Sequence, residues 1–166
     1  MRQTLLLSIL TAFLTVSAIA QAADCNAPAA PKVDWQRCYA DSRDLSGHDL
    51  TGARLRETSF QRSILKATTL TGADAYRARF VSAEMSGANL DGGIFVEADF
   101  TKADLSNASL KQADLRRTRF FRAQLRGADL TGARLQGADF LNADLSGARW
   151  TDGQRLCAEG SIGQCN

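Results

Sequence analysis

Histidine is nearly missing from this sequence, which contains only His48. A Ser-His-Asp or Cys-His catalytic arrangement therefore has a single residue around which it could form. No nucleophile and carboxylate accompany His48 in such a pattern, and the sequence has no phosphate-binding glycine loop. We interpret His48 as a capping or hydrogen-bonded residue, and we expect no enzymatic activity and no cofactor.

Cysteine is also sparse, and its spacing differs from that of a metal site. The four cysteines are Cys25, Cys38, Cys157 and Cys165, and no two of them form a CxxC pair. Because zinc sites typically use closely spaced ligand pairs, we predict no metal site. Four cysteines permit three disulfide pairings, so their number alone does not choose one.

An excess of one charge sign is likewise lacking. The chain carries 20 Lys and Arg residues and 18 Asp and Glu residues, which gives a formal net charge of +2. A nearly neutral surface creates no global field that would attract nucleic acid or an anionic membrane. We therefore expect no nucleic-acid partner.

The chain has no apolar run of the roughly 20 residues needed to span a bilayer. The run from Leu5 to Ala20 follows Arg2 and ends in the small-x-small sequence Ala20-Gln21-Ala22. This arrangement is typical of a cleaved secretory signal peptide. Asp24 precedes Cys25, which argues against lipoprotein processing. We expect export to the periplasm or the extracellular space, with no membrane association after cleavage.

What the sequence does contain is a strict period of five. From Leu45 to Trp150 every fifth residue is apolar, and only Ala75 in this series is small. A small residue, usually alanine, stands two positions before most members of the series. A period of five fits neither a helix face nor an alternating strand, so it indicates an internal repeat. Each pentapeptide is interpreted as one side of a coil, a short extended piece followed by a corner.

A second period of twenty gives the number of sides. Five of the eight phenylalanines recur at this interval, namely Phe60, Phe80, Phe100, Phe120 and Phe140. We predict that one coil has four sides and that these five residues form a stack in the core. Outward charges alternate in sign at the same interval, in the series Glu57, Arg77, Glu97, Arg117 and the series Arg79, Asp99, Arg119, Asp139. Such residues would be neighbours in adjacent coils, roughly 4.7–4.9 Å apart.

The repeats resemble those of the pentapeptide repeat family, whose consensus is Ala, Asp or Asn, Leu and two variable residues. Matching stretches include Ala128-Asp129-Leu130-Thr131-Gly132, Ala138-Asp139-Phe140-Leu141-Asn142 and Ala143-Asp144-Leu145-Ser146-Gly147. The resemblance covers about 22 consecutive repeats. It implies an all-β solenoid, a right-handed quadrilateral β-helix of about 5.5 coils with the Ala and Leu positions inside.

The expected organisation has four parts. Residues 1–22 are the signal peptide, 23–42 an N-terminal lead-in and cap, 43–152 the β-helix and 153–166 a C-terminal disulfide cap. About 5.5 coils make the stack roughly 26 Å tall, whereas disulfide-bonded Cα atoms lie within about 7 Å. Bridges between the two ends are therefore excluded, and we predict Cys25–Cys38 and Cys157–Cys165.

The two ends of the stack depart from the repeat. Trp35 and Trp150 occupy core positions at the extremes, and we interpret them as apolar lids over the open ends. Arg43 and His48 take the small inward position, so the first coil is expected to be open or frayed. Eight glycines at the corners of two sides, including Gly47 and Gly52, fit the second central position of a type II turn.

The surface offers one candidate binding region. Phe121 is expected to be an exposed aromatic residue surrounded by guanidinium groups, a composition found at interface hot spots. Tyr76 and Val96 are expected to point outward on the neighbouring side. The candidate residues are Arg116, Arg117, Arg119, Phe121, Arg122, Arg126, Tyr76 and Val96. The competing interpretation is a solvated ladder in which apolar columns support pairing between coils.

The sequence therefore favours a non-enzymatic, exported interaction or scaffold protein that binds an unknown protein partner through this region. One alternative is a structural solenoid without a specific ligand. Another comes from the resemblance, because some family members mimic a DNA duplex and inhibit DNA topoisomerase. The nearly neutral surface and the signal peptide argue against it. The sequence leaves homodimerisation open.

Overall fold

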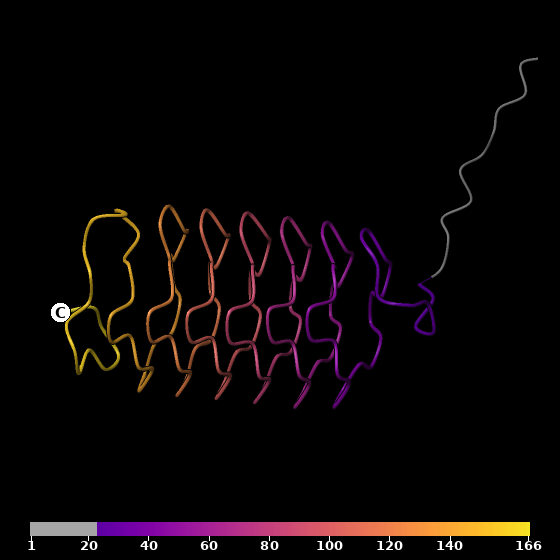
Figure 1. Ribbon diagram of the computed structural model, residues 1–166, viewed down its shortest axis with the longest axis horizontal. Coiled ribbons are helices and arrows are strands. Elements are labelled where there is room, and N and C mark those ends of the chain that lie inside the picture. The colour runs from indigo at the N-terminus through magenta and orange to yellow at the C-terminus, as the bar shows by residue number, and fades with distance from the viewer. Residues whose placement is uncertain (1–22) are drawn as a thin grey trace, which may run out of the picture.

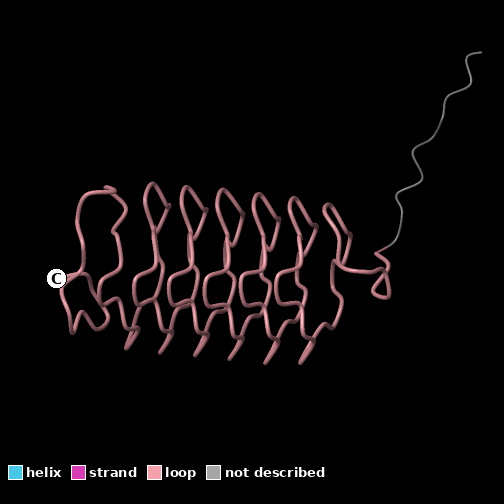
Figure 2. Ribbon diagram, viewed as in Figure 1, coloured by secondary structure: helices cyan, strands magenta, loops and turns pink. Residues whose placement is uncertain are grey.

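The computed structural model describes residues 23–166 of the protein, and the predicted signal peptide, residues 1–22, lies outside that range. A two-residue turn and a single bridged residue alternate every five residues from 31 to 152. Within residues 23–166 there is no helix, and the extended pieces are isolated β-bridges with no longer strand (Figure 2). The fold is thus made of corners joined by very short straight segments.

Successive coils are joined by parallel bridges between residues twenty apart. The bridges run without a break from Asp34↔Arg54 to Asp129↔Arg149. Four turns per twenty residues give each coil four sides, and the coils stack along one axis (Figure 1). We number the sides by their inward central residues: side 1 runs from Trp35 to Leu135, side 2 from Ala40 to Phe140, side 3 from Leu45 to Leu145 and side 4 from Leu50 to Trp150, each in steps of twenty.

Every corner of the regular coils has the same turn geometry, with or without glycine. The amide of Ala53, for example, donates to the Leu50 carbonyl oxygen at 3.0 Å, which closes a four-residue turn. The second central residue has positive φ, 63° at Gly52 and 59° at Glu57. Left-handed backbone costs a non-glycine residue roughly 1–2 kcal/mol. Hydrogen bonds between coils offset this cost: the Glu57 amide donates to the Tyr76 carbonyl oxygen at 2.8 Å.

The core is a single column of side chains enclosed by the four sides. The five phenylalanines of side 2 lie in one stack, with ring centroids 5.2, 4.8, 5.3 and 4.9 Å apart and rings nearly parallel. Where a hydroxyl replaces alanine, it is satisfied by the coil before it. Thr118 Oγ1 donates to the Phe95 carbonyl oxygen at 2.8 Å, and Ser63 Oγ to that of Ala40 at 2.9 Å. The column therefore leaves no buried hydroxyl without a partner.

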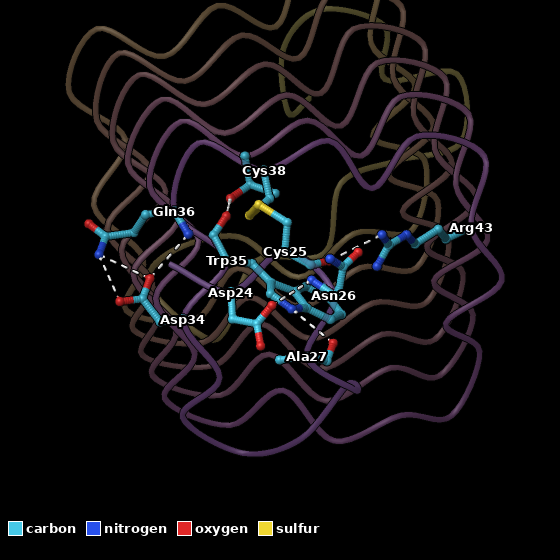
Figure 3. Close-up of a disulfide and its surroundings, with 10 residues drawn as sticks. Asp24, Cys25, Asn26, Ala27, Asp34, Trp35, Gln36, Cys38 and Arg43 are labelled. Carbon is cyan, nitrogen blue, oxygen red and sulfur yellow. Dashed lines mark hydrogen bonds between the residues drawn. A yellow bond between two sulfur atoms is a disulfide. The ribbon is translucent and has the colours of Figure 1, made fainter. Parts of the chain in front are cut away.

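The N-terminal end is closed, so the expectation of a frayed first coil was wrong. Residues 23–30 fold across the end of the coil and are tied down by the Cys25–Cys38 disulfide, with Cα atoms 5.4 Å apart (Figure 3). Trp35 is buried and donates its Nε1–H to the Ala27 carbonyl oxygen at 3.2 Å. The Arg43 guanidinium donates a hydrogen bond to the Cys25 carbonyl oxygen at 3.3 Å, and the His48 side chain is exposed to solvent.

The C-terminal end is closed differently. The chain after Trp150 doubles back and forms antiparallel bridges, Arg149↔Leu156 on side 4 and Asp144↔Ile162 on side 3. The Cys157–Cys165 disulfide, with Cα atoms 4.8 Å apart, holds this return segment together. Trp150 is half-buried against Phe140, with ring centroids 5.8 Å apart. In residues 23–166 no helix combines the length and the hydropathy required to cross a bilayer.

Gly93 occupies an inward position that alanine holds in most repeats, and its missing Cβ makes room for Phe95. A Cβ built on Gly93 would lie 2.5 Å from Phe95 Cε2 and 3.3 Å from the Ala73 carbonyl oxygen. We predict that Gly93→Ala lowers the free energy of unfolding by about 1–3 kcal/mol, because it overpacks the core and displaces the Phe95 ring. Denaturant unfolding measures the difference.

The control for this prediction is the same change made where the ring is absent. Side 1 already combines alanine with leucine one coil further on, at Ala113 and Leu115. In a Phe95→Leu background, Gly93→Ala should therefore cost nothing further. A Gly93→Ala variant as stable as the wild type would show that the ring relaxes freely.

Candidate functional site

A hollow of about 460 Å³ lies at the corner where side 1 meets side 2. Seven charged side chains of both signs surround it, and Ala98 and Thr118 complete its lining. We call it the corner groove. Its charged residues are Arg77, Arg79, Glu97, Asp99, Arg117, Arg119 and Asp139.

The repeat itself builds this groove. Arg77 is the second turn residue at the corner, and Arg79 is the bridged residue that follows on side 2. Between them lies the inward residue Ala78, which is buried. A step of twenty residues repeats the arrangement in the next coils, so two charge ladders run side by side along one corner. The groove is therefore a product of register and needs no irregular loop.

Glu97 is the central acceptor of the ladder on the side 1 edge. Its carboxylate lies 2.7 Å from Arg77 Nε and 3.0 Å from an Arg117 Nη atom. The Tyr76 hydroxyl donates to the same carboxylate at 3.3 Å. One carboxylate thus holds cations from the coils on both sides of it. The hydrogen bond from Arg77 and the charges of both arginines hold the pKa of Glu97 below its usual value of 4.5.

The ladder on the side 2 edge is only partly paired. Arg119 and Asp99 form an ion pair at 3.3 Å. Arg79 and Asp139, the first and last members of this series, make no ion pair within residues 23–166. Asp139 accepts the amide hydrogen of Leu141 at 2.9 Å, a local turn contact that leaves its charge uncompensated. Among the described residues, the groove therefore presents one cation, Arg79, and one anion, Asp139, that have no ion-pair partner.

The predicted cluster of arginines around Phe121 does not form. Only Arg122 lies over the Phe121 ring, 5.0 Å from its centroid, and Phe121 is half-buried. Arg116 points along side 1 and binds Asp114 with two hydrogen bonds of 2.7 Å. Arg126 belongs to side 3, where it pairs with Asp144 and Glu159. These five arginines are close in sequence, but the repeat distributes them over three sides of the coil. Four of them form ion pairs with carboxylates there.

Arg117 and Arg119 are the members of the predicted set that the structure brings together, since both line the corner groove. Tyr76 lies beside it, between the guanidinium groups of Arg56 and Arg77, 4.6 and 4.9 Å from its ring centroid. Val96 was expected to point outward, but it is only 6% exposed, in the column between Tyr76 and Arg116. It cannot serve as an exposed contact.

Sequence reasoning did not assign Arg77, Arg79, Glu97, Asp99 or Asp139 to the binding region, although the signal was present. Their alternation was interpreted as support for the register alone. The two ladders are offset by two residues across a buried alanine, and that offset places them on one corner. Combining both ladders would have located the groove.

The groove is suited to recognition by charge and shape. Within the part of the chain that the structure describes, no three His, Cys, Asp or Glu side chains are placed to hold a metal ion. His48 begins side 4 in the first coil, and it does not line the groove. Its Nδ1 contacts the Ser46 carbonyl oxygen at 3.2 Å. The arrangement can bind a partner that carries both charge signs in a fixed spacing.

Comparison with known proteins identifies the repeat. The family model described as pentapeptide repeats matches in eight copies over residues 44–80, 83–120 and 123–149. A search of curated proteins gave no match.

Solved structures of the same kind are similar to this chain. HetL, a pentapeptide repeat protein involved in heterocyst differentiation regulation in the cyanobacterium Nostoc sp. strain PCC 7120, is 28% identical with a TM-score of 0.51, over 74% of each chain. The pentapeptide repeat protein Rfr23 of the cyanobacterium Cyanothece 51142 is 18% identical with a TM-score of 0.57, over 63% of this chain and 85% of its own. These likenesses show a right-handed β-helix solenoid.

The charge ladders make stability depend on pH in a defined direction. Asp114, like Glu97, has a pKa below its ordinary value, here 3.8, chiefly because of the hydrogen bond from Arg116. A carboxylate with a lowered pKa stabilises the fold fully above its unfolded-state pKa and loses that contribution as pH falls through the folded value. We predict that the unfolding free energy is constant down to about pH 4.5 and falls below it.

A Glu97→Gln variant assigns part of this effect to the groove. It should be less stable than the wild type near neutral pH, and the difference should shrink as the pH falls below 4.5 and the wild-type carboxyl becomes protonated as well. Denaturant unfolding at each pH, with both disulfides intact, provides the comparison. A difference that stays constant across this range would contradict an electrostatic role for Glu97.

Proposed function

The chain belongs to the pentapeptide repeat family, and from that premise we propose that it is an exported, non-enzymatic interaction module that binds a protein partner along the corner groove. The observation that carries the proposal is the pair of charge ladders at one corner, where Arg79 and Asp139 have no ion-pair partner within residues 23–166. A protein surface carries both positive and negative charges, whereas all the charges of a nucleic acid backbone are negative phosphates.

The scaffold supports this proposal because it fixes the spacing of the charges. Neighbouring coils are held by backbone hydrogen bonds, such as that from the Phe100 amide to the Arg119 carbonyl oxygen at 2.8 Å. A partner therefore meets charges that are already positioned, which lowers the entropic cost of binding. The half-buried Phe121 and its cation–π partner Arg122 lie at the other corner of side 2, and we propose them as a second contact beside the groove.

We further infer that the repeat region comprises about 22 pentapeptides in about 5.5 coils. The region is bounded by the caps proposed from the sequence, residues 23–42 and 153–166. The two caps each carry a disulfide, and disulfides persist in oxidising compartments. This supports export, as does the signal-like segment at residues 1–22.

Export makes a prediction about the N-terminus. The full-length chain expressed in a bacterial host should be processed after Ala22, so that the mature protein begins at Ala23. Intact-mass analysis of the periplasmic fraction should show this product with no free thiols. Full-length protein recovered from the cytoplasm alone would contradict export.

The competing reading is a solenoid without a specific ligand, for which surface substitutions would be silent. A DNA-mimicking topoisomerase inhibitor is disfavoured by the mixed surface, where Arg56, Arg119 and Arg134 each neutralise an aspartate. Inhibition in a gyrase supercoiling assay would revive that alternative.

The proposal is tested by capture from periplasmic extract with the immobilised protein. We predict that Arg79→Gln, which removes the groove cation that makes no ion pair within residues 23–166, lowers recovery of the specific partner about tenfold, as expected for a contact worth about 1.4 kcal/mol. Phe121→Ala should weaken capture less, because its ring is half-buried.

The matched control is Lys32→Gln. Lys32 is exposed at the corner that precedes side 1 of the first coil, and it makes no ion pair within residues 23–166. This variant makes the same change in net charge and should capture as well as the wild type. Equal capture by the wild type and Arg79→Gln would remove the groove from the binding surface.

A further inference from the structure

The second turn residue of each repeat stands at a corner of the coil, and the four corners use it differently. Successive coils lie above one another along the stack (Figure 1), so each corner carries one column of these residues. Between sides 3 and 4 the column is uncharged and mostly glycine, namely Gly47, Ala67, Gly87, Asn107, Gly127 and Gly147. Between sides 2 and 3 it contains no glycine, and its members are Ser42, Arg62, Ser82, Lys102, Arg122 and Asn142. This column thus carries cations without an anion, and we call Arg62, Lys102 and Arg122 the cation ridge.

The backbone at the cation ridge is unfavourable for these residue types. The φ angle is 57° at Arg62, 58° at Lys102 and 56° at Arg122. This left-handed region suits glycine and costs free energy for a residue that has a Cβ. The fold accepts glycine at the equivalent place of other corners, with φ of 66° at Gly47 and 63° at Gly52. The three cations therefore stand where the backbone favours glycine.

Contacts within the protein do not account for these cations. Between sides 1 and 2 the same turn position carries charges that pair with each other, such as Arg77 and Glu97 at 2.7 Å. The side chains of the cation ridge make no ion pair and no hydrogen bond within residues 23–166. Arg122 lies over the Phe121 ring, 5.0 Å from its centroid. A strained residue that gives the fold no ion pair is suited to a contact outside the molecule.

The flank of the ridge on side 2 is partly apolar. The first turn residues of this corner include Val81, Phe121 and Leu141. Val81 and Phe121 are half-buried, and Leu141 is 59% exposed. Phe121 and Leu141 are twenty residues apart and therefore lie in adjacent coils, with Arg122 beside the first of them. A ligand on the ridge thus gains apolar contact on this flank.

The flank on side 3 is acidic. Glu84 and Asp144 pair with cations of their own side, at 2.7 and 3.1 Å. Asp104 follows Lys102 by two residues and accepts an amide hydrogen from its own turn at 2.9 Å. A broad anionic surface, such as a membrane, would bring its charges against these carboxylates and be repelled. A narrow chain can follow the ridge and the apolar flank alone.

We propose that the cation ridge binds an acidic, partly apolar peptide segment of a protein partner, laid along the stack. The inference rests on the proposed function, in which Phe121 and Arg122 are a second contact, and it adds the chemistry of what binds there. The binding energy comes from carboxylates that meet the cations and from apolar side chains that cover Phe121 and Leu141.

The length of the ridge fits such a segment. From Arg62 to Arg122 the ridge spans sixty residues of sequence, which is three coils or roughly 14 Å. An extended segment of five residues covers about the same distance and presents every second side chain on one face. Acidic residues at alternate positions therefore meet the ridge. The next residues pass beyond Arg122 toward Leu141, one coil further on, and are apolar.

The test is fluorescence anisotropy with a labelled peptide that has three glutamates at alternate positions, serines between them and two leucines at each end. The protein is expressed from the full-length chain and purified with both disulfides intact. The wild type should bind this peptide, and it should not bind a version with glutamine in place of glutamate. Arg62→Gln and Lys102→Gln should each raise the dissociation constant about threefold, and changing all three cations about thirtyfold. The fold accepts glutamine in this turn, since Gln112 has φ of 56°.

Lys32→Gln is the matched control. Lys32 holds the same turn position at the corner between sides 4 and 1, with φ of 60°, and it is exposed without an ion pair within residues 23–166. This variant should bind the peptide as well as the wild type does. Phe121→Ala should weaken binding of the peptide with leucines, and it should leave binding of a version with serine at the ends unchanged.

A stability measurement separates a binding role from a structural one. Lys102→Gly should raise the midpoint of denaturant unfolding, because it relieves the left-handed backbone and removes no ion pair found within residues 23–166. The same variant should weaken peptide binding. A lower midpoint would show that the Lys102 side chain serves the fold and would count against the proposal.

Three further results would overturn the proposal. The first is a wild type that does not bind the peptide, and the second is a Lys32→Gln variant that loses as much affinity as Lys102→Gln. The third is tighter binding to phosphatidylglycerol vesicles than to the peptide, which would assign the ridge to a membrane. Capture with Arg79→Gln tests the corner groove separately, so failure of the ridge is distinguished from failure of the proposed function.

Discussion

The structure depends on one backbone bond, repeated from Trp35 to Leu130, from the amide of the central residue on each side to the carbonyl oxygen nineteen residues later. Phe80, Phe100 and Phe120 make it to Asp99, Arg119 and Asp139 at 2.7–2.8 Å. Because this bond fixes the coil at twenty residues, it also fixes which side chains are vertical neighbours. The phenylalanine stack, the satisfied threonines and the charge ladders all follow from that single register. The left-handed turn residues follow from it too, since the coil can close only if every corner adopts the same geometry.

Features that depend on the register could be predicted from the sequence for the same reason. The twenty-residue interval at which phenylalanine recurs from Phe60 to Phe140 indicated four sides per coil, and the structure contains the resulting ring stack. The alternation of charge from Glu57 to Arg117 predicted ion pairs between adjacent coils, two of which form at Glu97. In a periodic sequence each inference about the register is tested again in every repeat, so a wrong repeat length would disagree with the residue pattern within a few coils. The family and the solenoid fold were therefore predictable from the residues alone.

Features set by one side chain's choice of partner were not predictable in this way. Arg116 and Arg126 are near Phe121 in sequence, but each finds carboxylates on its own side of the coil. The first coil also resisted prediction, since Arg43 and His48 break the inward pattern without opening it. Residues outside the repeat close that end, and the five-residue period carries no information about them. Side-chain rotamers and end caps are determined by their immediate surroundings, whereas the register is common to all coils of the stack.

The same distinction explains where this molecule can meet a partner. In the middle of the stack the backbone groups are used between coils, and most charges are neutralised by the coil above or below. A ligand there must replace existing ion pairs, and exposed pairs yield little net energy. Binding can gain only where the ladder ends or misses a pairing, as at Arg79 and Asp139 in the corner groove. At the ends of the stack the gain is different, because the last coil has unused backbone groups and apolar side chains. The N-terminal cap covers Trp35, whereas the return segment leaves Phe140 and Trp150 only partly buried, so the two ends of the stack are not equivalent.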